Sequence, residues 1–149
     1  MNLRFALDCL INAERVKHGL PALKLNVPLI KAARTHANAA VSWKWWGPGK
    51  DSHTNPITRS KPAGRMKYAG YCPGQSFSSA EITYTGWGGG GTPRAAFTWW
   101  MNSPTHRAII LDPGLTEIGR VALPGAADES GAGAAGAGTY VADLGHCGP

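Results

Sequence analysis

Two histidines and one glutamate, His53, Glu81 and His106, are the residues of this chain whose types best suit chemistry. Two imidazoles and a carboxylate form the ligand set of a catalytic zinc site that keeps one position open for water. Without a metal, the same side chains suit a general acid and base, with the carboxylate orienting one imidazole. The distances between them along the chain carry no ligand-spacing signature. Residue types alone therefore also allow three polar residues with structural roles.

The segment around His106, Trp99–Arg107, predicts a junction between two helices. We expect one helix to end near the paired tryptophans and a second to begin at once, with Ser103 as N-cap and Pro104 as its first residue. His106 would then lie in the first turn, where the helix macrodipole disfavours its protonation. A neutral imidazole in that place can bind a metal, move a proton or only pack.

The other three histidines are predicted to have other roles. His18 follows a helix and is expected to cap it at the surface, where a charged imidazole complements the dipole. His36 lies beside alanines of a predicted helix and is expected to be a hydrogen-bonded core residue rather than a ligand. His146, near the end of the chain, has no partner that the sequence suggests.

The elements that must position these residues follow from apolar periodicity and from cap and turn residues. We predict strands over 79–85, 117–123 and 139–144. The two glycine-rich segments, 88–91 and 131–138, are predicted to be a mobile connector and a flexible hairpin loop. Ile30, Ala33, Ala37, Ala40 and Val41 should form the buried face of the second helix. The predicted helices run from 3 to Gly19, from the Asn26 cap to about 41, over 59–69, from Thr92 to Trp100, and onward from Ser103. This order indicates an α+β fold in which helices cover an antiparallel sheet.

Composition narrows the class of protein. The 149 residues are 43% hydrophobic and 16% charged, which fits one folded domain over 1–149. No apolar run approaches the ~20 residues of a membrane span, and Asp8 interrupts the apolar start that would otherwise suggest a signal peptide. The net charge of +6 comes from scattered basic residues without a nucleic-acid motif. We therefore expect no specific nucleic-acid partner and a monomer.

The three cysteines allow one disulfide and one free thiol, with three possible pairings. Cys9 lies in an apolar helical stretch and is expected in the core. Cys72 and Cys147 lie among turn residues and are the preferred pair. Such a bridge would place the protein outside the reducing cytosol.

Several segments, taken in order, resemble the bacterial branch of the CAP superfamily. This superfamily, also called SCP-like, is named for cysteine-rich secretory proteins, antigen 5 and pathogenesis-related 1 proteins. The similar segments are Leu10–Arg15, Gly19–Leu23, Ala32–Ala37, Ser52-His53, Arg65 with Ala69–Tyr71, Ala80–Ile82, Trp100–Leu111 and Glu117–Gly119.

The resemblance implies a secreted, three-layer α-β-α sandwich with a central antiparallel sheet and an open cleft. Family members often line that cleft with two histidines and two acidic residues, and some bind a divalent metal there. His53, Glu81 and His106 match three of the four positions, whereas His36 matches a histidine outside that set. The usual second acidic residue is missing, because Asn102 or Ser103 occupies its region, and Glu117 lies on another segment.

Three functions remain open at this stage. The first is a cleft that binds a ligand, with Zn²⁺ or another divalent metal held by His53, His106 and Glu81. The second is a metal-dependent hydrolase, protease-like, in which Glu81 relays protons for a metal-bound water. A serine hydrolase is disfavoured, since the chain has no Gly-x-Ser-x-Gly turn and Ser103 is expected to be a cap.

The third function is a module that binds sterols, lipids or cell-wall polymer through exposed indoles. Trp43, Trp45, Trp46 and Trp87 lie in loop-like segments where they could do so. The alternative is that these tryptophans cover the ends of the sheet as ordinary core.

Overall fold

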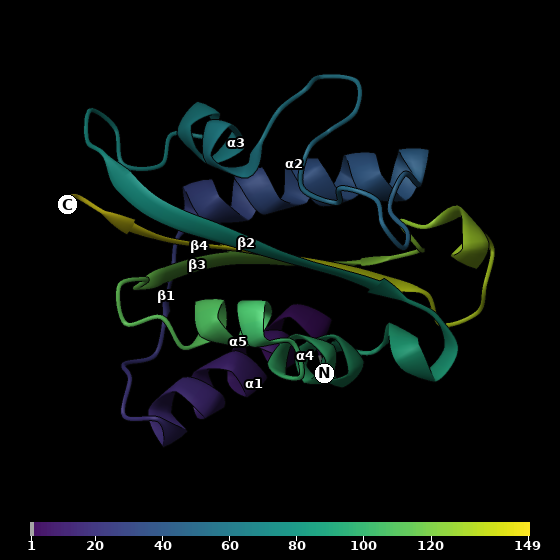
Figure 1. The fold of residues 1–149 in the computed structure, drawn as a ribbon, viewed down its shortest axis with the longest axis horizontal. Coiled ribbons are helices and arrows are strands. Elements are labelled where there is room, and N and C mark those ends of the chain that lie inside the picture. The colour runs from purple at the N-terminus through teal and green to yellow at the C-terminus, as the bar shows by residue number, and fades with distance from the viewer. Residues whose placement is uncertain (1) are drawn as a thin grey trace.

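A four-stranded sheet lies between two layers of helices in the computed structural model, which describes residues 2–149 (Figure 1). One layer contains α2 (Val27–Trp43) and α3 (Pro62–Tyr68). The opposite layer contains α1 (Leu3–Lys17), α4 (Pro93–Met101) and α5 (Pro104–Ile110). This arrangement confirms the predicted α-β-α sandwich.

The sheet contains β1 (Lys24–Leu25), β2 (Phe77–Gly86), β3 (Glu117–Pro124) and β4 (Gly138–Cys147), in the order β1-β3-β4-β2. The three long strands pair antiparallel, as predicted, but β1 pairs with β3 in parallel. The chain crosses the sheet edge between α1 and α2 at this point. In β1 and just after it, the backbone N–H groups of Lys24 and Asn26 donate to the carbonyls of Thr116 and Ile118. The central antiparallel sheet is therefore confirmed, and β1 is a short parallel addition that the sequence did not predict.

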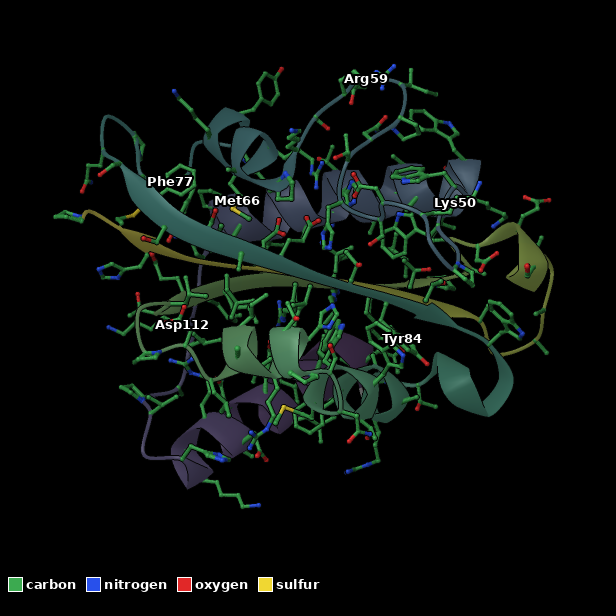
Figure 2. The ribbon with its side chains drawn as sticks, viewed as in Figure 1. Lys50, Arg59, Met66, Phe77, Tyr84 and Asp112 are labelled. Carbon is green, nitrogen blue, oxygen red and sulfur yellow. A yellow bond between two sulfur atoms is a disulfide. The ribbon has the colours of Figure 1, made fainter. Side chains whose placement is uncertain are left out.

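Strand β2 forms one edge of the sheet, and its side chains alternate between the two layers. Ile82 packs in the cluster with Trp100 of α4, while Glu81 faces His36 of α2. Tyr84 lies on the α4 side of the sheet and Met66 lies between α3 and the sheet (Figure 2). The edge strand therefore presents chemically different faces to the two helical layers.

Alanines let α2 lie close to the sheet. Ala33, Ala37 and Ala40 are fully buried against Val121 and Val141, as the helical pattern predicted. The phase of the helix differs slightly from the prediction, because Leu29 and His36 are buried whereas Ile30 and Val41 are only partly so.

Cys9 is exposed, so the prediction of a core cysteine was wrong. Leu7, Ile11 and Arg15 follow one another at intervals of four residues and form the buried face of α1. A residue two positions after Leu7 lies away from that buried face of the helix, which is why the Cys9 thiol is exposed.

The segment Gly88–Gly91 is a 3₁₀ turn, η1, rather than a mobile connector. The hydroxyls of Tyr84 and Tyr140 donate to the carbonyls of Gly90 and Gly91, and Gly88 N–H donates to Ala135. A side chain at Gly91 would overlap the backbone carbonyl of Gly136. Glycine is needed because the two glycine-rich segments pack backbone against backbone.

The predicted disulfide joins Cys72 to Cys147 and ties the segment after α3 to the end of β4. It closes a loop across a sequence separation of 75 residues. We expect the double variant Cys72→Ser/Cys147→Ser to lose about 3 kcal/mol of unfolding free energy, measured by urea denaturation, because its unfolded chain is less constrained. Cys9→Ser, at an exposed thiol, is the matched control and should change little. Equal stability of the two variants would contradict this role.

No helix within residues 2–149 combines the length and the apolar character that a membrane span requires.

Candidate functional site

A buried ion pair between Glu81 of β2 and Arg65 of α3 is the centre of the site. One Arg65 nitrogen donates to Glu81 Oε1 at 3.1 Å and to Oε2 at 3.0 Å. The same nitrogen donates to the His53 carbonyl at 2.8 Å. The guanidinium thus connects the sheet to the loop that carries His53. Sequence reasoning named Arg65 only among the segments that resemble the CAP superfamily and assigned it no role.

His53 completes this cluster with its imidazole. Its Nδ1 lies 2.9 Å from Glu81 Oε1, and its side chain is 39% exposed. Burial alone would raise the pKa of Glu81, but the hydrogen bond from His53, together with smaller contributions that include the charges of His36 and Arg65, outweighs burial and lowers that pKa. Because Glu81 is ionised, Nδ1–H of His53 must donate, which leaves Nε2 as the free nitrogen.

The loop that carries His53 is fixed locally. Asp51 Oδ1 accepts hydrogen bonds from the backbone N–H groups of His53 and Thr54, at 2.8 and 3.1 Å. The Ser52 hydroxyl lies 2.7 Å from the Thr83 hydroxyl on β2. These bonds hold the imidazole of His53 against the edge of the sheet.

His36 is a hydrogen-bonded core residue, as predicted. Its Nε2 donates to the Ser52 carbonyl at 2.6 Å, and burial lowers its pKa. It also lies beside the cluster, since the same nitrogen is 3.8 Å from Glu81 Oε1. Its role is to support the loop next to His53.

Asp143 of β4 is the member that sequence reasoning missed. It pairs directly with Glu81 across the sheet and is fully buried. Neither carboxyl oxygen has a well-formed hydrogen bond within residues 2–149. Burial, and then the charge of Glu81, raise the pKa of Asp143 well above its usual value. The pair therefore holds one negative charge, on Glu81, opposite the single positive charge of Arg65.

A signal for Asp143 was present in the sequence. An aspartate inside the otherwise apolar run Tyr140–Leu144 is unusual for a buried strand. Which residue lies opposite Asp143 depends on the strand register, and the register cannot be predicted from the sequence alone.

His106 belongs to α5 and approaches from the other helical layer. Its Nδ1 lies 2.6 Å from the Ser103 hydroxyl, and its ring centroid is 5.0 Å from that of Trp99. Burial, and then the charge of His53, lower the pKa of His106, in the direction expected for a neutral ring. Ser103 occupies the N-cap position, but its side chain makes no capping bond and holds the imidazole instead.

The three predicted residues do not form one ligand cluster. Within residues 2–149 no group of three or more His, Cys, Asp or Glu side chains could hold a metal ion. Glu81 is the hydrogen-bond partner of His53. Asn102, at the exposed end of α4, supplies no acid. The second acidic residue of the site is Asp143, and it comes from the sheet.

An open groove runs along the edge of β2 beside both histidines. It has a volume of about 510 Å³ and includes Ser52, next to His53, and Trp99, against which His106 packs. Three tryptophans line it: Trp46 from the loop after α2, Trp87 after β2, and Trp99 of α4. Lys50 and Tyr84 enter it from opposite sides of the sheet (Figure 2).

The family model described as "Cysteine-rich secretory protein family" (CAP) matches residues 10–138. This chain belongs to the CAP family. A curated relative, the uncharacterized protein YkwD of Bacillus subtilis (strain 168), is 34% identical over 110 residues, which cover 74% of this chain and 38% of YkwD. The CAP domain described here thus spans well under half of that relative.

Solved structures share the CAP fold at low sequence identity. An outer surface protein from Borrelia burgdorferi has a TM-score of 0.71 and 21% identity, covering 97% of this chain and 92% of that one. An extracellular protein containing an SCP domain, from Bacillus anthracis str. Ames, has a TM-score of 0.72 and 19% identity, covering 93% and 38%. A cysteine-rich secretory protein from Staphylococcus aureus has a TM-score of 0.62 and 18% identity, covering 96% and 38%.

Proposed function

We propose that this CAP domain is a ligand-binding module whose cleft takes up a divalent metal, such as Zn²⁺, through His53 and His106. The observation that supports the proposal best is the hydrogen bond between His53 Nδ1 and the buried carboxylate of Glu81. A histidine that binds a metal through one ring nitrogen usually donates the other N–H to a carboxylate, a carbonyl or water. That bond sets the tautomer and orients the ring.

The site offers two imidazole ligands for a metal, those of His53 and His106. His106 has the same pattern as His53, since its Nδ1 is engaged by the Ser103 hydroxyl. Glu81 is not available as a third ligand, because its carboxylate is buried and bound by Arg65 and His53. When bound, the metal would supply open coordination positions for an oxygen or nitrogen of the ligand.

Binding is better supported than hydrolysis. The hydrolase hypothesis needs Glu81 to exchange protons with a water, yet its side chain is 1% exposed and its pKa is lowered. An ionised carboxylate held by a guanidinium is a poor proton carrier at neutral pH.

We also propose that the protein works outside the reducing cytosol. The Cys72–Cys147 disulfide supports this location, since such bridges persist in oxidising compartments. Two of the structural relatives are described as an outer surface protein and an extracellular protein.

Metal binding can be tested by titrating chelator-treated protein with Zn²⁺ in a calorimeter. We expect His53→Ala/His106→Ala to weaken binding about 10-fold or more, because both imidazole ligands are gone. The matched control is His18→Ala/His146→Ala, which removes two imidazoles outside the cleft. Wild-type binding should weaken in acid, because protons compete with the metal for the ring nitrogens. Equal affinity in the two double variants would refute the site.

A further inference from the structure

The groove along β2 has an unusual lining for a protein surface. Trp99 is 51% exposed and Trp87 is 38% exposed, although burial of an indole is strongly favourable. Both line the same hollow, and the buried Trp46 lines it too. Exposed aromatic rings gathered in one concave place mark a binding surface rather than incomplete core.

The two exposed indoles are held rigidly. The Trp99 ring packs against those of Tyr84 and His106, with centroid distances of 5.8 and 5.0 Å. Trp87 packs its six-membered ring on Gly131, where any side chain would overlap the indole. A ligand would therefore meet preformed aromatic faces, and little conformational entropy would be lost when it binds.

Polar groups lie between these aromatic faces. Asp128 accepts one hydrogen bond, from Ser130 N–H to Oδ1, and its Oδ2 makes none within residues 2–149. The Lys50 ammonium likewise makes no hydrogen bond in the described part of the chain. Asp128 and Lys50 are the two charged residues that line the groove, and their opposite charges leave it close to neutral. This lining favours an uncharged ligand with many hydroxyl groups.

We propose that this groove binds a segment of an uncharged pyranose polysaccharide. The C–H face of a sugar ring packs on an indole, while the hydroxyls at the ring edge hydrogen-bond to Asp128 and Lys50. An acyl chain or a sterol would instead require an enclosed apolar cavity, and would leave the carboxylate and ammonium desolvated without partners. The volume of about 510 Å³ is within the ordinary range for small-ligand sites.

This inference goes beyond the proposed function, because it assigns a ligand to the groove that lies beside the two histidines. It does not require the metal, since neither His53 nor His106 lines the groove. Carrying out the glycan experiment in the presence of EDTA therefore keeps the two proposals separable.

The test is a calorimetric titration, in EDTA, with two soluble hexasaccharides: β-1,4-linked N-acetylglucosamine and β-1,4-linked glucose. We expect saturable binding of at least one, with a Kd below about 1 mM. Trp99→Ala and Trp87→Ala should each weaken it about 10-fold, as expected when an aromatic anchor is truncated. Asp128→Asn, which leaves every aromatic face intact, should weaken it several-fold.

Trp43→Ala is the matched control, because Trp43 is 47% exposed but lies outside the groove. Its affinity should equal that of the wild type, and thermal unfolding of each variant checks that it is folded. Absence of saturable binding by both sugars would overturn the proposal, as would equal weakening by Trp43→Ala. Binding to phosphatidylglycerol vesicles that depends on Trp99, with no sugar binding, would overturn it in favour of a lipid surface.

Discussion

Glu81→Gln is expected to lower the free energy of unfolding by about 4 kcal/mol. Glu81 carries the negative charge that balances Arg65, and both side chains are buried. Removing one member of a buried ion pair leaves the other charge desolvated without compensation, which is the main reason for so large an effect. The amide also cannot accept the hydrogen bonds of both Arg65 and His53 as the carboxylate does.

Urea denaturation of Glu81→Gln beside Glu117→Gln measures this effect. Glu117 is a matched carboxylate on β3, accepting neutral hydrogen bonds from Tyr71 and Asn26, and its loss should change stability by only about 1 kcal/mol. If the two variants were equally stable, the Arg65–Glu81 pair would not be the electrostatic centre of the site.

Substitution of Asp143 gives a second test of the charge balance between Glu81 and Arg65. Because the pKa of Asp143 is raised, its carboxyl is protonated and resembles an amide, so Asp143→Asn should change stability by less than about 1 kcal/mol at acidic pH. In Glu81→Gln the like charge is gone, and Asp143 can ionise and partly balance Arg65. The double variant should therefore lose more stability than the two single variants added together.

The two carboxyls also predict opposite pH dependences. Asp143 has a raised pKa in the folded protein, so its favourable contribution is complete below its unfolded value of about 3.9 and is lost as the pH rises toward the folded value. Glu81 has a lowered pKa, so its contribution is present above its unfolded value and is lost as the pH falls through the folded value. Asp143→Asn should therefore gain stability relative to the wild type as the pH is raised.

Arg15→Met is expected to be the most destabilising single change, by about 5 kcal/mol. Arg15 is 1% exposed and donates to four backbone carbonyls, those of Pro21, Ile110, Asp112 and Leu115, at 2.9–3.0 Å. Hydrogen bonds from a charged donor contribute about 1.5–3 kcal/mol each, and within residues 2–149 only the Asp112 carbonyl of the four has a second donor, the backbone N–H of Leu115. Burial lowers the pKa of Arg15, but a guanidinium stays charged in any protein environment.

Thermal and urea unfolding of Arg15→Met, Arg15→Lys and Arg4→Met will measure this role. Lysine keeps the charge but cannot reach carbonyls in several directions, so Arg15→Lys should recover only a small part of the loss. Arg4 lies on the same helix, and its guanidinium makes no hydrogen bond within residues 2–149, so Arg4→Met should be close to neutral. A small loss in Arg15→Met would show that the segment after α5 is held by its apolar contacts instead.

Local patterns predicted most of the elements because they are set by neighbouring residues. Asn26 caps α2 with its side chain, as the Asn-Val-Pro sequence indicated, and Thr92 caps α4 in the same way. The β-branched and aromatic run around Ile82 became β2, although the strand extends beyond the predicted 79–85. Cys72 and Cys147 pair as their turn-rich surroundings favoured.

The burial of charged residues was the property that sequence reasoning predicted least well. Arg15 and Arg65 read as scattered surface charges, since most arginines are exposed, yet both are buried and hold distant segments together. For Cys9 the error was the opposite one: it was predicted to be buried but is exposed, because an apolar stretch of helix does not show which of its faces is covered.

The sequence by itself determined the family, the helices and long strands, and the candidacy of His53, Glu81 and His106, and it favoured the Cys72–Cys147 pairing among three. The tertiary structure decided which of those residues contact one another and which other side chains they bind. Strand register placed Asp143 opposite Glu81, and the packing of α3 on the sheet brought Arg65 to the same carboxylate. Protonation, tautomer and free lone pairs follow from such long-range contacts, because desolvation and nearby charges set pKa values and neither can be read from neighbours in the chain.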